Sequence, residues 1–197
     1  MECIDDNLIR PVSDGRPLSP TLPNFLRTIP HLNCLTGTIN GSGFHWNGLD
    51  SSLTSAFLHL MHLPTINHID LSYIESFPLS SLTPSVNLHR LDISYLTRSD
   101  PPDEDVSQKP KIHELHTSNF ALGARKLLHA KTQDGRPAFN FTDLTRLSMS
   151  FEDEQNVRYL LQNAKLLQEL HLLVDRYQDS DLRGFFPPAQ VLLKSLI

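Results

Sequence analysis

Residues 65–72 read Thr-Ile-Asn-His-Ile-Asp-Leu-Ser, with apolar side chains at Ile66, Ile69 and Leu71 and polar side chains around them. If Ile66 is position 1, the apolar residues stand at positions 1, 4 and 6. The same spacing returns along the chain, more loosely in its first and fourth copies, and the six copies begin at Leu32, Ile66, Leu88, Ile112, Leu144 and Leu167. A short pattern that recurs at intervals of 22 to 34 residues is typical of a repeat architecture.

We expect each copy to form a short β-strand in a parallel stack. If positions 1, 4 and 6 face the core, positions 3, 5 and 7 face the opposite, concave side, because side chains alternate along a strand. Each position then becomes a column across the sheet, with neighbours about 4.8 Å apart. The position-3 column reads Cys34, His68, Arg90, Glu114, Arg146 and Glu169. The position-5 column reads Thr36, Asp70, Asp92, His116, Ser148 and His171.

The segments between the copies carry apolar residues at helical spacing. Helical or turn segments are expected at residues 25–29, 53–63, 74–82, 121–130 and 157–164. Ser51 and Ser52 are the expected N-terminal cap of the second of these segments. The segment at 74–82 is too short for a long helix and is expected to bury Phe77, Leu79 and Leu82. Trp46 is expected to be a packing anchor.

The repeats are predicted to occupy residues 23–175. Residues 1–22 contain three prolines and few large apolar side chains, which predicts a poorly ordered lead-in. Residues 98–111 combine acidic residues with prolines and have nothing to bury, so we expect a solvated acidic loop in place of a return helix. The pattern fades after residue 175, and residues 176–197 are expected to form a partial C-terminal cap.

Composition excludes several classes of protein. The chain has 197 residues, is 39% hydrophobic and carries a formal net charge of −5, which allows one good core but provides no basic surface for nucleic acid. Its two cysteines, Cys3 and Cys34, are too few for a disulfide scaffold. The N-terminus has no apolar signal sequence, and no stretch approaches the roughly 20 apolar residues that span a bilayer. We therefore expect no membrane association and a cytoplasmic or nuclear location.

This spacing of strands and return segments resembles a leucine-rich-repeat solenoid over about residues 25–175. The resemblance implies an α/β fold, a fragment of a ribonuclease-inhibitor-like horseshoe. Such a fragment has about six irregular repeats, a parallel sheet on the concave face and helices or loops on the convex face. Each repeat buries its apolar side only by stacking on its neighbours.

A narrower resemblance involves Trp46-Asn47-Gly48-Leu49, the run from Leu63 to Leu71, and Phe77-Pro78-Leu79. These residues are similar to fungal F-box-associated leucine-rich-repeat proteins. In that family an N-terminal F-box docks onto a ubiquitin-ligase core and the repeats hold the substrate. Residues 1–31 of this chain contain no recognisable F-box.

The concave face is the predicted partner-binding surface. Charges along the position-3 column alternate in sign from Arg90 to Glu169, which is explained either by mutual support or by a patterned surface that recognises a partner. Asp70 lies beside Asp92, so we expect this acidic spot to be the centre of the surface. The predicted partner-binding residues are His68, Asp70, Arg90, Asp92, Glu114, His116, Arg146, Ser148, Glu169 and His171.

No catalytic or metal-binding residues are predicted. His59 and His62 share a helix without further ligands at suitable spacing, and His113 and His116 lie on opposite faces of a strand, whereas zinc needs three or four converging ligands. The sequence also lacks a Gly-x-Ser-x-Gly elbow and shows no paired carboxylates or cysteine–histidine arrangement with a supporting context.

The sequence therefore predicts a non-catalytic protein–protein interaction module without a cofactor or a metal. Its partner is an unknown protein, and the resemblance to F-box proteins implies a ubiquitin-ligase adaptor or a substrate. Two alternatives stay open. The chain is a truncated, inactive fragment of a longer leucine-rich-repeat protein, as its apolar end at residues 191–197 suggests, or it is an enzyme.

Overall fold

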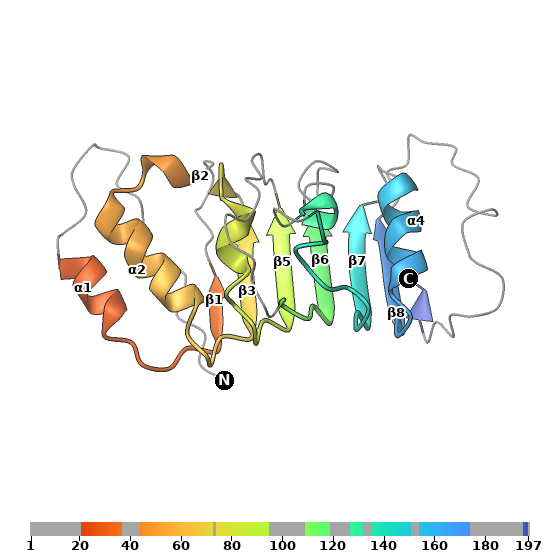
Figure 1. The fold of residues 1–197 in the computed structure, drawn as a ribbon, viewed down its shortest axis with the longest axis horizontal. Helices are drawn as coiled ribbons and strands as arrows, with labels where there is room; N and C mark the ends of the chain where they lie inside the picture. Colours follow the sequence, from red (N-terminus) through yellow and green to blue (C-terminus); the bar gives the residue numbers. More distant parts are fainter. Residues whose placement is uncertain are drawn as a thin grey trace.

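The computed structural model describes residues 21–36, 44–72, 74–94, 109–118, 127–131, 135–150, 154–173 and 195–196. In these residues the main feature is a parallel sheet of seven strands that lie side by side in chain order (Figure 1). The strands are β1 (Cys34–Thr36), β3 (His68–Ser72), β5 (Arg90–Ser94), β6 (Glu114–Ser118), β7 (Arg146–Ser150), β8 (Glu169–Leu173) and β9 (Ser195–Leu196). The predicted α/β class with a parallel sheet of repeated strands is confirmed.

The six predicted copies pair in the register that their spacing implies. The position-3 column pairs Cys34 with His68 and continues to Glu169 on β8, and the position-5 column pairs Thr36 with Asp70 and continues to His171. Both columns contain the residues expected from the sequence, so the predicted ladders are confirmed.

A repeated pair of backbone hydrogen bonds fixes where each strand begins. The carbonyl oxygen of Asn33 accepts the backbone N–H groups of Asn67 and His68, with N–O distances of 3.0 and 3.1 Å. The next four repeats use the same arrangement, in which the position-2 carbonyl accepts the position-2 and position-3 N–H groups of the following repeat. The five acceptor residues are Asn33, Asn67, His89, His113 and Thr145.

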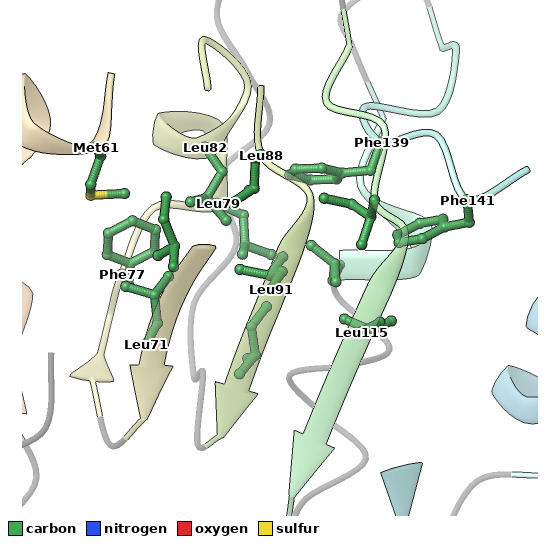
Figure 2. Close-up of a cluster of buried hydrophobic side chains, with 14 of the residues drawn as sticks. Met61, Leu71, Phe77, Leu79, Leu82, Leu88, Leu91, Leu115, Phe139 and Phe141 are labelled. Atoms are coloured by element: carbon green, nitrogen blue, oxygen red, sulfur yellow. The ribbon is translucent and has the colours of Figure 1, made fainter. Parts of the chain in front are cut away.

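The core lies on the opposite side of the sheet from the position-3 and position-5 columns. At positions 1 and 4 every one of the six copies is at most 7% exposed. Position 6 is also buried on β3, β5, β6 and β7. Its residue on β6, Thr117, is polar, and the other three are apolar. Figure 2 shows Leu71, Leu91 and Leu115, from three successive strands, in one cluster of buried side chains.

Helices and short turns connect the strands and cover this core. The described helical segments are α1 (Thr21–Arg27), η1 (Trp46–Gly48), α2 (Ser51–Met61), η2 (Leu79–Leu82) and α4 (Glu154–Asn163). Residues 127–129 are also helical, while the rest of the helix expected at 121–130 lies outside the described residues. A separate two-stranded parallel pair, β2 (Phe44–His45) with β4 (Ile74–Glu75), was not expected from the sequence.

The cap of α2 differs from the prediction. Asp50, not Ser51 or Ser52, is the N-cap residue, and its carboxylate accepts the backbone N–H groups of Ser52 and Leu53 at 2.9 and 3.0 Å. The carboxylate thereby satisfies two donors of the first turn, at the positive end of the helix dipole.

The predicted domain boundaries need one correction. Helix α1 begins at Thr21, so the last two residues of the expected lead-in are helical. Pro23 fits there because a first-turn N–H has no helical partner to lose. Three predicted features lie wholly or mostly outside the described residues: the rest of the lead-in, residues 98–108 of the acidic loop, and most of the expected cap. Within the range of that cap, Ser195 and Leu196 pair with β8.

The aromatic residues next to β3 form the expected anchor. Trp46 is buried and meets Phe77 edge-on, with ring centroids 4.8 Å apart and an interplanar angle of 77°. Phe77 is fully buried at 0% exposure, and Leu79 and Leu82 of η2 are buried with it, as predicted (Figure 2). Phe139 and Phe141 are buried in the same way near β6, and neither was predicted from the sequence.

Replacing Phe77 by alanine should remove the centre of this aromatic cluster. We expect Phe77→Ala to lower the free energy of unfolding by about 3–5 kcal/mol, since it deletes a fully buried ring and leaves a cavity. The matched control is Phe25→Ala, because Phe25 is 56% exposed, and its effect should stay near 0.5 kcal/mol. Urea unfolding followed by circular dichroism measures both. Equal losses for the two variants would contradict the assigned core.

Candidate functional site

Two rows of polar side chains share the face of the sheet that lies opposite the core. We call this surface the polar face, the position-3 column the first row, and the position-5 column the second row. Parallel pairing brings all ten predicted partner-binding residues onto this face of β3 to β8. Neighbouring residues of one row are about 4.8 Å apart, so interactions along a row are direct.

The first row forms a continuous chain of ion pairs from β5 to β8. Arg146 Nη1 lies 3.0 Å from Glu114 Oε1, and Arg146 Nε lies 3.0 Å from Glu169 Oε2. Arg90 Nη1 reaches the other oxygen of Glu114 at 3.9 Å. The arginine side chains are about half exposed, so each pair contributes at most about 1 kcal/mol. Mutual support, one of the two explanations of the alternating charges, is therefore present in the structure.

Asp92 lies at the centre of a tighter group. Its Oδ2 accepts hydrogen bonds from His68 Nε2 and Arg90 Nη2, both at 2.9 Å, and Arg90 Nε contacts both carboxylate oxygens. Burial would raise the pKa of Asp92, but the hydrogen bonds from His68 and Arg90 and their charges outweigh it and lower that pKa. Asp92 is thus an ionised carboxylate although only 7% of the residue is exposed.

This group changes the interpretation of the acidic spot. Asp70 does stand directly opposite Asp92 in the sheet, and His68 and Arg90 are the residues that compensate Asp92, as expected. The carboxylate of Asp92 is engaged by these two side chains and nearly covered, so it offers little surface to a partner. The other members of the second row, Thr36 and Asp70 before Asp92 and the three residues after it, are half-buried.

The second row continues through His116, Ser148 and His171, which face one another across β6, β7 and β8. All three residues are half-buried. Across the parts of the chain that the structure describes, their side chains form no hydrogen bond or ion pair. They therefore present polar atoms that are partly removed from water and have open hydrogen-bonding capacity.

Sequence reasoning missed one contact on the polar face. Cys34 Sγ lies 3.1 Å from His68 Nδ1, while the other ring nitrogen of His68 bonds Asp92. The expectation that no cysteine–histidine arrangement has a supporting context is therefore wrong. The signal was present in the first row, where Cys34 directly precedes His68, but motif searches compare residues that are close in sequence.

No metal site is formed by the described residues, in which no three histidine, cysteine, aspartate or glutamate side chains converge. His62 Nε2 contacts the carbonyl oxygen of Ser81 at 2.8 Å. His89 and His113 stack with ring centroids 4.1 Å apart. Burial and, to a smaller extent, the charge of His113 lower the pKa of His89.

Among the described helices none is long and apolar enough to cross a membrane.

No family model matches the chain, and no curated protein matches it. The geometry of the polar face is thus the basis for assigning a function.

Removing the charge of Asp92 should destabilise the fold in a pH-dependent way. We expect Asp92→Asn to lower the free energy of unfolding by about 1–3 kcal/mol at pH 7, because Arg90 and His68 lose a charged acceptor. The pKa of Asp92 is lower in the folded than in the unfolded chain, so its stabilisation is complete above about pH 5 and is lost as pH falls through the folded value. Urea unfolding at pH 7, 5 and 3.5 measures the difference.

The matched control is Asp143→Asn, which removes a carboxylate that pairs with exposed Lys111 at 3.7 Å. That change should cost less than about 1 kcal/mol. A difference between wild type and Asp92→Asn that grows as pH falls would contradict the role given to the Asp92 carboxylate.

Proposed function

We propose that this chain is a leucine-rich-repeat solenoid that acts as a non-catalytic protein-interaction module. Support for the repeat class comes from six copies of one apolar pattern, in-register parallel strands, and the same pair of backbone hydrogen bonds at each strand start. Return segments of unequal length, a helix at α2 and a short turn at η2, fit an irregular member of that class.

One observation carries the binding proposal: the half-buried row of His116, Ser148 and His171 makes no internal hydrogen bond or ion pair within the described residues. A half-buried polar group without a hydrogen-bond partner costs free energy, and a bound partner that completes its hydrogen bonds removes that cost. In the neighbouring first row, Arg146 already forms ion pairs with Glu114 and Glu169. This row therefore presents a polar surface to a partner but little unpaired charge.

The partner that fits this surface is a protein with polar, weakly charged groups. Two imidazoles and a hydroxyl accept and donate hydrogen bonds but attract no strongly charged ligand when the histidines are neutral. The formal charge of −5 does not favour a polyanion. A ubiquitin-ligase adaptor or substrate is a candidate that rests on the sequence resemblance alone.

A charge placed in the second row should abolish binding. We expect Ser148→Arg to reduce partner recovery at least about tenfold, because it puts an unpaired cation and a long side chain between His116 and His171. Affinity capture from cell extract, followed by quantitative mass spectrometry, compares this variant with the wild-type chain.

The matched control is Ser55→Arg, the same substitution at an exposed site on α2. A protein recovered with wild type and Ser55→Arg but depleted with Ser148→Arg binds the polar face. Unfolding midpoints of both variants must stay near that of wild type. If all three chains recover the same proteins in equal amounts, the polar face is not the binding surface.

A further inference from the structure

At the β1 end of the polar face, three successive strands contribute a cysteine, a histidine and an aspartate in contact. Cys34 on β1 lies directly opposite His68 on β3, with Sγ 3.1 Å from Nδ1. His68 Nε2 lies 2.9 Å from Oδ2 of Asp92 on β5. A nucleophile, a base and a group that orients the base are thus held in line by adjacent strands of one sheet.

The protonation state of His68 follows from its partners. Asp92 is ionised, since its pKa is lowered, and an ionised carboxylate only accepts hydrogen bonds. Nε2 of His68 therefore carries a proton and donates it to Asp92. In the neutral ring the lone pair lies on Nδ1, the atom that faces the sulfur of Cys34. His68 is positioned to accept the thiol proton.

The neighbouring strand holds the His68 ring in place. Asp92 accepts the hydrogen bond from His68 Nε2, and Arg90 on the same strand holds the carboxylate through both oxygens. Thr36 Oγ1 lies 3.7 Å from Cys34 Sγ on the accessible side of β1. Asp70 stands two residues after His68 on β3, on the same face of the sheet.

Access to the sulfur selects small reagents. Cys34 is a reduced thiol that is 8% exposed, and the His68 side chain beside it is 24% exposed. A bulky substrate cannot reach such a sulfur without rearrangement, whereas a molecule of a few atoms needs only a small opening. Hydroperoxides are electrophiles of that size, and thiolates react with them to give sulfenic acids.

We infer that Cys34, His68 and Asp92 form a thiol-modification site at which Cys34 is oxidised by hydroperoxides. Nδ1 of His68 takes the proton from Sγ, and the thiolate attacks one peroxide oxygen. A sulfur–oxygen bond forms and the oxygen–oxygen bond breaks, so that the sulfur is oxidised by two electrons and the peroxide is reduced. The imidazolium returns its proton to the leaving oxygen. Asp92 is a positioning residue. This site is independent of partner binding by the second row.

The first test measures the thiolate with iodoacetamide in a Cys3→Ser chain, in which Cys34 is the one remaining cysteine of the sequence. At pH 6 we expect Cys34 to react at least about tenfold faster in the native protein than in urea, although folding buries it. The native rate should rise less than about fivefold from pH 6 to 8, whereas an ordinary thiol with a pKa near 8.5 gains roughly 70-fold. Slower reaction in the native protein at pH 6 would overturn the proposal.

The second test exposes the same chain to hydrogen peroxide in the presence of a cyclic 1,3-diketone that traps sulfenic acids. Mass spectrometry should find the adduct on Cys34, and a Cys34→Ser chain should give none. Rapid alkylation without a trapped sulfenic acid would overturn the assignment of hydroperoxides as the reagent.

Variants separate the base from the general structure. His68→Gln should slow alkylation at pH 6 at least about tenfold and restore the steep pH dependence, because the proton acceptor is gone. The matched control is His59→Gln, the same substitution at an exposed histidine of α2, away from the polar face, which should leave the pH profile unchanged. Ser148→Arg should also leave the reactivity of Cys34 unchanged. The partner-binding proposal and the thiol-modification proposal can therefore fail independently of each other.

Discussion

The paired backbone hydrogen bonds at the start of each strand are the interaction on which the rest of the structure depends. A carbonyl oxygen has two lone pairs, and the position-2 carbonyl uses both to hold consecutive N–H groups of the next repeat. This double contact sets the first paired residue of the next strand. A slip by one residue would turn every leucine of that strand outward and every charged residue inward. Backbone atoms make these two bonds in every repeat, so position 2 tolerates side chains as different as those of Asn67, His89 and Thr145. The Thr145 hydroxyl adds a further hydrogen bond to the His113 carbonyl, at 3.1 Å.

Register set at the strand start leaves the return segments considerable freedom. One return is the helix α2, another is the short turn η2, and near β6 the aromatic rings of Phe139 and Phe141 fill the corresponding space. What each return must supply is apolar volume beneath the sheet, not a particular secondary structure. Phe77 shows how few residues suffice, since a single fully buried ring contacts Trp46 and packs beside η2.

This division explains which features the sequence predicts well. Strand positions, core leucines and both polar rows follow from spacing within six or seven residues, so the repeat pattern alone predicts them correctly. The α2 cap was predicted wrongly, because Asp50, Ser51 and Ser52 are all good capping residues and only the backbone at the turn selects one. The pairing of Cys34 with His68 is a contact between repeats, and it becomes visible when the rows are compared across strands. The burial of Asp92 could not be predicted, because the sequence shows that the residue is charged but not how much of its surface the neighbouring side chains cover.

Asp92 also determines how the polar face divides. It belongs to the second row, yet its hydrogen bonds go to Arg90 and His68 of the first row. The hydrogen bonds of the Asp92 carboxylate therefore go to side chains of β3 and β5. His116 stands opposite Asp92 on β6 and forms no hydrogen bond with that carboxylate. Polar groups from β1 to β5 thus satisfy one another and tune the sulfur of Cys34, while those from β6 to β8 leave the second row open. A single shared carboxylate separates a region suited to covalent chemistry from a region suited to reversible binding.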